Sequence, residues 1–186
     1  MKRSCITSCC NKSLEQSLQS LMISPFEDGT VETRKLFSYF LHNAPNIESV
    51  HSTQIPYIMH TAVFERMLES RHFKYQKFCW ANAVIENELC KGFLDGDSLC
   101  LKCKRFICKK KKAEKGSKVE TNLECFLRHI RNAIAHGRVY FCHAGNRIHI
   151  VFEDVNASGK LSARIVCIKA DLEYWKTVLS DKRYYS

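Results

Sequence analysis

Residues 131–137, Arg-Asn-Ala-Ile-Ala-His-Gly, gather the side chains best suited to chemistry in this chain. An arginine carries a planar charged group that fits a phosphate. A histidine can accept or donate a proton near neutral pH. Arg131 and His136, with Asn132 beside the arginine, therefore indicate chemistry on a phosphodiester, with RNA as the favoured substrate and no metal required.

A helix over residues 122–136 is predicted to carry these side chains. Thr121 and Glu124 fit a capping box, in which their side chains bond the free backbone N–H groups at the start of a helix. Gly137 can take the left-handed conformation that commonly ends one. Apolar residues between these two signals recur at helical spacing and form one stripe, namely Leu123, Phe126, Leu127, Ile130 and Ile134.

The geometry of a helix decides which of the polar side chains can cooperate. At about 100° per residue, Asn132 and His136 share a face opposite the apolar stripe, with Arg128 and His129 beside it. Arg131 and His136 point about 140° apart, so one straight helix brings them together poorly. A kink at the helix end or a second copy of the helix could do so. A two-fold dimer through the motif helix would place both copies around one cleft.

The run FLRHIRNAIAHGRVYF at residues 126–141 resembles the signature of the HEPN superfamily, in which a histidine follows an arginine after four to six residues. The segment over residues 147–175 is similar to plasmid-borne bacterial HEPN proteins that have a β-hairpin after the motif helix. The resemblance covers about residues 121–176, and residues 1–120 share only a helical character. It implies a metal-independent endoribonuclease that works as a homodimer, with many relatives acting as toxins or in antiviral defence.

The resemblance also implies a mechanism. The 2′-hydroxyl of RNA attacks the neighbouring phosphorus and leaves a cyclic phosphate and a free 5′-hydroxyl. Such a transesterification needs proton transfer and positive charge on the developing phosphorane. We expect His136 to transfer protons, Arg131 to bind the phosphate, and Asn132 to orient His136 or the phosphate through its amide. No cofactor and no metal ion is expected.

Composition agrees with a small basic protein in the cytoplasm. The chain has 186 residues with 29 Lys or Arg and 19 Asp or Glu, a net charge of +10. Such an excess favours a polyanionic partner such as RNA, although basic proteins also bind acidic proteins or membranes. No stretch is long enough to span a membrane, and no signal peptide is recognised. The odd number of cysteines, 11, favours a reducing compartment.

The fold class predicted is mainly α, a HEPN-type helical bundle with a small C-terminal antiparallel β-hairpin or meander and a closing helix. Residues 1–30 are assigned to an N-terminal segment and residues 31–186 to one HEPN-like domain. Periodicity and breaking residues predict helices over residues 13–22, 31–41, 56–68 and 73–90. The β-region is expected over 138–168, and the closing helix over 171–180, capped by Asp171.

Residues 102–118 carry nine Lys or Arg and one acidic residue, Glu114. The segment fits a solvated, partly disordered loop, because like charges repel one another. It also fits an electrostatic guide for RNA beside the motif helix. The residues expected to bind RNA are Lys109, Lys110, Lys111, Lys112, Arg128 and Arg138.

Two other patterns could bind metal. Asp95 and Asp97 could be ligands, but the sequence Asp-Gly-Asp-Ser is typical of a turn. Cys100, Cys103 and Cys108 could supply three zinc ligands, with Cys90 or a distant histidine as the fourth. Their irregular spacing favours free thiols.

Three function classes follow. The first is a dimeric endoribonuclease, a toxin or an anti-phage defence effector, for which an antitoxin is a possible partner. The second is a module of HEPN shape without turnover that binds RNA or dimerises, partnering a nucleotidyltransferase or a defence complex. The third is a zinc-dependent nucleic-acid-binding protein.

Overall fold

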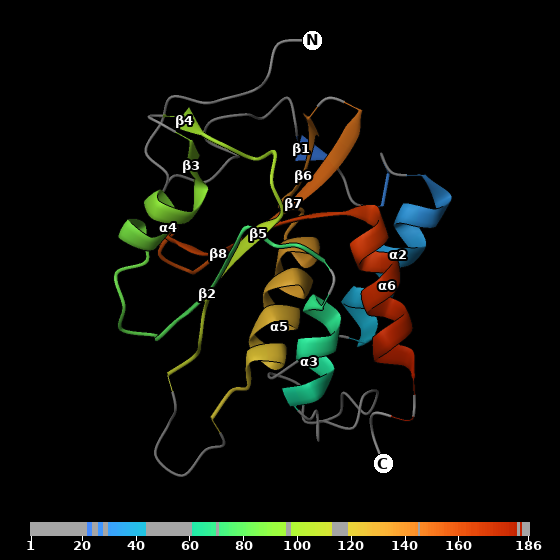
Figure 1. Ribbon diagram of the computed structural model, residues 1–186, viewed down its shortest axis with the longest axis horizontal. Helices are drawn as coiled ribbons and strands as arrows, with labels where there is room; N and C mark the ends of the chain where they lie inside the picture. Colours follow the sequence, from blue (N-terminus) through green and yellow to red (C-terminus); the bar gives the residue numbers. More distant parts are fainter. Residues whose placement is uncertain are drawn as a thin grey trace.

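A six-stranded sheet is the centre of the protein. The computed structural model describes residues 22–23, 26–27, 30–43, 61–69, 71–95, 98–112, 119–144, 146–181 and 183. The strands of the sheet are β1 (Met22–Ile23), β2 (Tyr75–Cys79), β5 (Arg105–Lys109), β6 (Val139–Ala144), β7 (Arg147–Val155) and β8 (Leu161–Ile168). Their order is β1-β6-β7-β8-β5-β2 (Figure 1). Neighbours are antiparallel, except that β2 and β5 are parallel.

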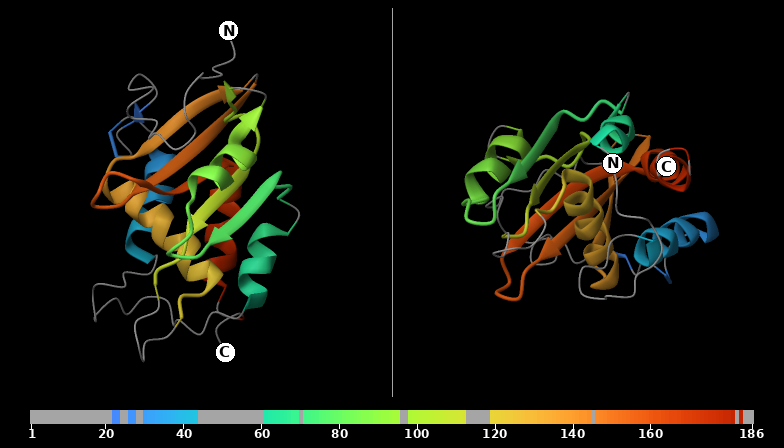
Figure 2. Two further views of the ribbon diagram at one scale, coloured as in Figure 1. Left: turned by 90° about the vertical axis from the view of Figure 1, so that its left-hand side faces the viewer. Right: turned by 90° about the horizontal axis from the view of Figure 1, so that it is seen from below.

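Helices cover both faces of this sheet. One face carries α2 (Val31–Asn43), α3 (Thr61–Leu68), α5 (Asn122–Ala135) and α6 (Lys169–Ser180). The other carries α4 (Glu86–Phe93) with the small hairpin of β3 (Leu94–Asp95) and β4 (Ser98–Leu99). Helix α5 lies against the sheet, and α2 and α3 pack beside it (Figure 2). The sheet is therefore buried between two helical layers of unequal size.

The central strands contribute to two cores, because successive side chains of a strand point to opposite faces. Phe152 of β7 and Ile165 of β8 belong to the core beneath α5. Their neighbours Val151 and Val166 belong to the core beneath α4. Strands that are covered on both faces need apolar residues along most of their length. The apolar runs of β7 and β8 meet this requirement.

The expectation of a mainly α-helical bundle with only a small C-terminal hairpin is wrong. The predicted meander exists as β6, β7 and β8, but β5 and β2 extend it on one side and β1 on the other. Strand β5 lies inside the lysine-rich segment that was expected to be a solvated loop. Its Phe106 and Cys108 enter one core, and Ile107 enters the other. The strand was not predicted because charged residues flank its three core residues on both sides.

Most of the predicted helices are confirmed where the structure describes them. Residues 31–43, 61–68, 122–135 and 169–180 are helical. Asp171 was expected to cap the closing helix, but the N-cap residue is Ile168, and Asp171 lies in the first turn of α6, where its Oδ2 accepts the Ile168 N–H at 3.0 Å. The helix predicted over residues 13–22 lies outside the described residues except at Met22, which belongs to β1. Asp95 pairs with Ser98 across the predicted turn.

The helix predicted over residues 73–90 is wrong. Residues 75–79 form β2, and only residues 86–93 are helical. Gly92 lies inside α4, where the ring of Tyr75 comes so close that a side chain would collide with it. The glycine therefore serves the packing of α4 on β2.

The core beneath α4 contains a buried ion pair between β7 and β8. Arg164 Nε donates to Glu153 Oε1 at 2.7 Å, and both side chains are 0% exposed. The guanidinium groups of Arg164 and Arg105 lie 5.6 and 5.7 Å from the centroid of the Phe93 ring. Burying a charge is costly unless it is paired. Arg164 must therefore stay paired with Glu153 if α4 is to cover it.

Glu153→Gln should lower the free energy of unfolding by about 3–5 kcal/mol, because it leaves the Arg164 charge buried without its anion. Urea denaturation at neutral pH measures the change. Glu173→Gln is the matched control, since Glu173 pairs with Lys169 at 3.6 Å on the surface and should lose less than about 1 kcal/mol. Equal losses in the two variants would contradict the assignment.

Candidate functional site

Helix α5 begins and ends as the sequence predicts. Glu124 N–H donates to Thr121 Oγ1 at 3.2 Å, and Thr121 N–H donates to Glu124 Oε2 at 2.7 Å, which completes the capping box. At the other end Gly137 takes a φ of +64°. His136 is the C-cap residue, and its N–H donates to the Asn132 carbonyl. The motif histidine thus sits where the helix ends and the chain turns into β6.

Most of α5 is buried, and its last turn is the accessible part that carries the motif. Residues 125–130 are all buried between the sheet and the neighbouring helices. Arg131 and Asn132 are half-buried, whereas Ala135 and His136 are exposed. Arg128 and His129, expected beside the polar face of Asn132 and His136, are therefore among the buried residues. Solvent reaches the chemistry-bearing residues only near the C-terminal end.

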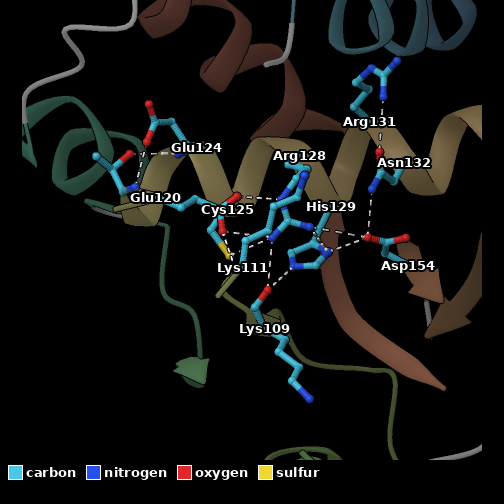
Figure 3. A network of polar contacts seen from close by, with 11 residues as sticks. Lys109, Lys111, Glu120, Glu124, Cys125, Arg128, His129, Arg131, Asn132 and Asp154 are labelled. Carbon is cyan, nitrogen blue, oxygen red and sulfur yellow. Dashed lines mark hydrogen bonds and ion pairs between the residues drawn. The ribbon is translucent and has the colours of Figure 1, made fainter. Parts of the chain in front are cut away.

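A chain of hydrogen bonds holds Arg131 and Asn132 in place (Figure 3). Arg131 Nη1 donates to Asn132 Oδ1 at 3.3 Å. Asn132 Nδ2 donates to Asp154 Oδ2 of β7 at 3.1 Å. The asparagine amide therefore connects the arginine to a buried carboxylate. Among the described residues no hydrogen bond joins Arg131 to His136, in keeping with their divergent directions on one helix.

His129 anchors this chain in the interior. Its Nδ1 lies 2.6 Å from Asp154 Oδ2, and its Nε2 lies 2.9 Å from the Lys109 carbonyl oxygen. Both partners are acceptors, so both ring nitrogens carry a proton and the imidazole is charged. Burial alone would lower the pKa of His129, but the hydrogen bond to Asp154, together with the interaction with Cys125, outweighs it and raises the pKa to about 9. A histidine held in this form is a structural cation.

The same ion pair acts on the carboxylate. Burial would raise the pKa of Asp154, but the hydrogen bond and the charge of His129 lower it, and the bond from Asn132 adds to this effect. Asp154 is therefore an anion at neutral pH. One oxygen of this carboxylate accepts from both His129 and Asn132, so the buried pair fixes the side chain next to Arg131.

Arg128 was expected to contact RNA, but it is only 7% exposed. Its Nε and Nη2 donate to the Glu120 carboxylate at 2.6 and 3.0 Å, and Nη2 also donates to the Lys109 carbonyl at 3.1 Å. This bidentate pair lies on the side of α5 that carries Arg128, next to the face of Asn132 and His136. The end of β5 covers that side, so Arg128 joins the helix to the sheet.

The other expected RNA contacts are closer to solvent. Lys111 and Lys112 are exposed, and Lys109, Lys110 and Arg138 are half-buried. The side chain of Lys109 points away from α5 although its carbonyl binds the helix (Figure 3). The lysine run therefore follows the end of β5 and starts directly beside the motif helix. Of the two histidines on β6 and β7, His143 is exposed and His149 is buried.

Sequence reasoning missed Asp154 and Glu120. Asp154 follows Glu153 inside the otherwise apolar run of β7, and two adjacent acids in a buried strand indicate buried cationic partners. That signal was available in the sequence. No comparable signal marks Glu120, since its partner Arg128 is defined only by how α5 lies against β5.

The described residues contain no group of three or more His, Cys, Asp or Glu side chains placed to hold a metal ion. Cys100 and Cys108 are buried, and Cys103 is half-buried. Among the helices described, none is both long and apolar enough to cross a membrane.

Comparison with known proteins gives one match. The model of the family described as HEPN pEK499 p136 matches residues 16–179. This range includes α5, the meander and most of α6. Searches of curated proteins and of solved structures found no match.

His129→Gln should reveal the buried cation through the pH dependence of stability. The folded-state pKa lies above the ordinary value, so the stabilisation is complete below about pH 6.5 and disappears as the pH rises through 9. We expect the wild type to exceed the variant by roughly 2–3 kcal/mol more at about pH 7 than at about pH 10. Urea denaturation at both pH values measures this difference.

His143→Gln is the control, because this histidine is exposed on β6 and should show no such dependence. The range from pH 7 to pH 10 lies above the pKa of the neighbouring Cys125 thiol. Burial would raise the pKa of Cys125, but contacts with Cys108 and His129 lower it to about 6. A loss in His129→Gln that is the same at both pH values would mean that His129 contributes packing alone.

Proposed function

The chain belongs to the HEPN pEK499 p136 family, and we propose that it is a metal-independent endoribonuclease that cleaves RNA by 2′-hydroxyl transesterification. We further propose a role as a toxin or an anti-phage defence effector. The observation that carries the activity is the end of α5, where Arg131 is held by Asn132 and His136 is open to solvent. An arginine suited to bind a phosphate and a histidine suited to transfer a proton thus lie near the accessible end of one helix.

Each residue has a role that its contacts support. Asn132 engages Nη1 of Arg131, and the remaining N–H groups of the guanidinium fork can bind a phosphate. The exposed imidazole of His136 can exchange a proton with the 2′-hydroxyl or with the leaving oxygen. The amide of Asn132 is already used by Arg131 and Asp154. We therefore assign Asn132 to positioning Arg131, in place of orienting His136.

A two-fold dimer would complete the site. Arg131 and His136 diverge on one helix, and most of α5 is covered by the sheet, α2 and α3. The contact between copies is accordingly proposed at the last turn of α5, where Ala135 and His136 are exposed. The arginine of one copy could then face the histidine of the other across a bound phosphodiester.

A non-catalytic module is the second candidate. In that case the protein would bind RNA or dimerise as the partner of a nucleotidyltransferase or another defence component. The involvement of Asn132 in the buried network favours it, because a motif residue bound to Asp154 also has a purely structural reason to be present.

Arg131→Ala and His136→Ala should each reduce RNA cleavage in EDTA by at least about 100-fold, the usual contribution of a general acid–base or a charge-stabilising group. Gel analysis of labelled RNA measures the rate. The products should end in a cyclic phosphate, and a substrate with 2′-deoxy residues should resist cleavage.

Arg147→Ala and His143→Ala are matched controls, since both residues are exposed near the tip of the β6–β7 hairpin and should retain cleavage. Undiminished cleavage by the two motif variants would contradict the catalytic assignment. An absence of cleavage by the wild type with varied RNAs would favour the non-catalytic module.

Mixing the two inactive variants tests the composite site. If the arginine and the histidine come from different copies, a mixed dimer of Arg131→Ala with His136→Ala retains one intact pair. Random exchange should then restore about one quarter of the wild-type rate. The measurement is cleavage after joint refolding, with each variant refolded alone as the control. No recovery would contradict a division of the two groups between copies.

A further inference from the structure

The two tryptophans of this chain have opposite environments. Trp175 of α6 is 0% exposed and lies in the hydrophobic core, whereas Trp80, which directly follows β2, is 69% exposed. Tryptophan has a large apolar surface and is highly buried on average in folded proteins. An indole presented to solvent at the end of a strand is therefore available for a ligand.

The parallel pairing of β2 and β5 brings the lysine run to this indole. Parallel strands end at the same edge of a sheet, so Trp80 and Lys110 emerge side by side. Lys110 N–H donates to the Cys79 carbonyl at 2.8 Å, which fixes the two chains at this point. Lys110 Nζ lies 5.5 Å from the centroid of the Trp80 ring. The cation lies over one side of the ring, and the high exposure of the indole leaves other surface for a second planar group.

The charge around this edge of the sheet is positive. Lys111 and Lys112 are exposed next to Lys110. Two nearby acids are already engaged: Glu88 binds Tyr75 and lies near Lys77 and Lys91, and Glu120 binds Arg128 and the Lys111 N–H. The lysine charges are therefore available to an anionic ligand.

We propose that Trp80 and the lysines at positions 110–112 form a binding site for single-stranded RNA, in which a base stacks on the indole and the lysines contact the flanking phosphates. Only an unpaired base can lie flat on such a ring, and stacking tolerates any base. The carbonyl of the preceding Lys109 is bound by Arg128 and His129 of α5. The site therefore leads toward the motif helix. The choice of RNA as ligand rests on the proposed function.

Tryptophan fluorescence tests this site directly. A single-stranded 2′-O-methyl uridine oligomer resists cleavage at the 2′-position, so it reports binding alone. Because Trp175 is in the core, quenching on addition of the oligomer reports Trp80. Trp80→Ala should weaken binding of the labelled oligomer, measured by fluorescence anisotropy, by about 5- to 100-fold, the loss expected for one stacked base. Trp80→Phe should retain most of the affinity, and Lys110→Ala should weaken binding and lower its salt dependence.

Controls separate this proposal from the proposed function. Lys160→Ala, which removes an exposed lysine in the β7–β8 turn, should bind normally, and His136→Ala should still show quenching. Cleavage by the wild type without quenching, or unchanged affinity in Trp80→Ala, would overturn the stacking site and leave the ribonuclease proposal standing. Binding and quenching without cleavage would support the stacking site and count against the ribonuclease. If Trp80→Ala dissociates a dimer in light scattering, the indole is a protein contact and the proposal is overturned.

Discussion

The ion pair between His129 and Asp154 is the interaction on which the rest of the site depends. It lies in the interior between α5 and β7, and the second nitrogen of the imidazole reaches the backbone of β5. One side chain thus joins a helix to two strands that are not adjacent in the sheet. An isolated buried charge would be severely destabilising. The Asp154 carboxylate and the Lys109 carbonyl both accept hydrogen bonds from the charged imidazole. These two bonds stabilise the charge only when α5 lies in this position on the sheet.

The consequence reaches the surface through Asn132. The oxygen of Asp154 that accepts from His129 also accepts from the asparagine amide, and the amide oxygen accepts from Arg131. The motif arginine is therefore oriented by a network that continues into the core. Such support would serve the phosphate-binding role proposed for Arg131, since catalytic groups act well only when held in a defined geometry. His136 lacks this support and lies on the open end of the helix.

The two-sided sheet explains why the site has so little accessible surface. Helix α5 packs on the sheet with α2 and α3 beside it, while Arg128 closes the side toward β5 by binding Glu120. Little of the helix remains for a partner except its last turn. The same layering places β2 and β5 at one edge of the molecule, where the exposed indole and the lysine run meet. The proposed stacking site and the proposed contact with a second copy would thus use separate surfaces.

Local signals in the sequence were enough to predict α5, its capping box, its glycine stop and the meander after it, because each depends on neighbouring residues. They were also enough to pick out Arg131, Asn132 and His136. The sheet beyond the meander was missed, since β5 has only three alternating core residues among lysines, and its burial depends on β2 and β8 on its two sides. Only the tertiary structure decided that Arg128 and His129 are buried. Helical geometry predicts the direction in which each side chain leaves the helix, but it does not predict which other elements pack against that side. Asp154 and the Lys109 carbonyl come from distant segments, and Glu120 directly precedes the helix. The fold alone therefore determines that most of the motif helix is buried and that its last turn remains accessible.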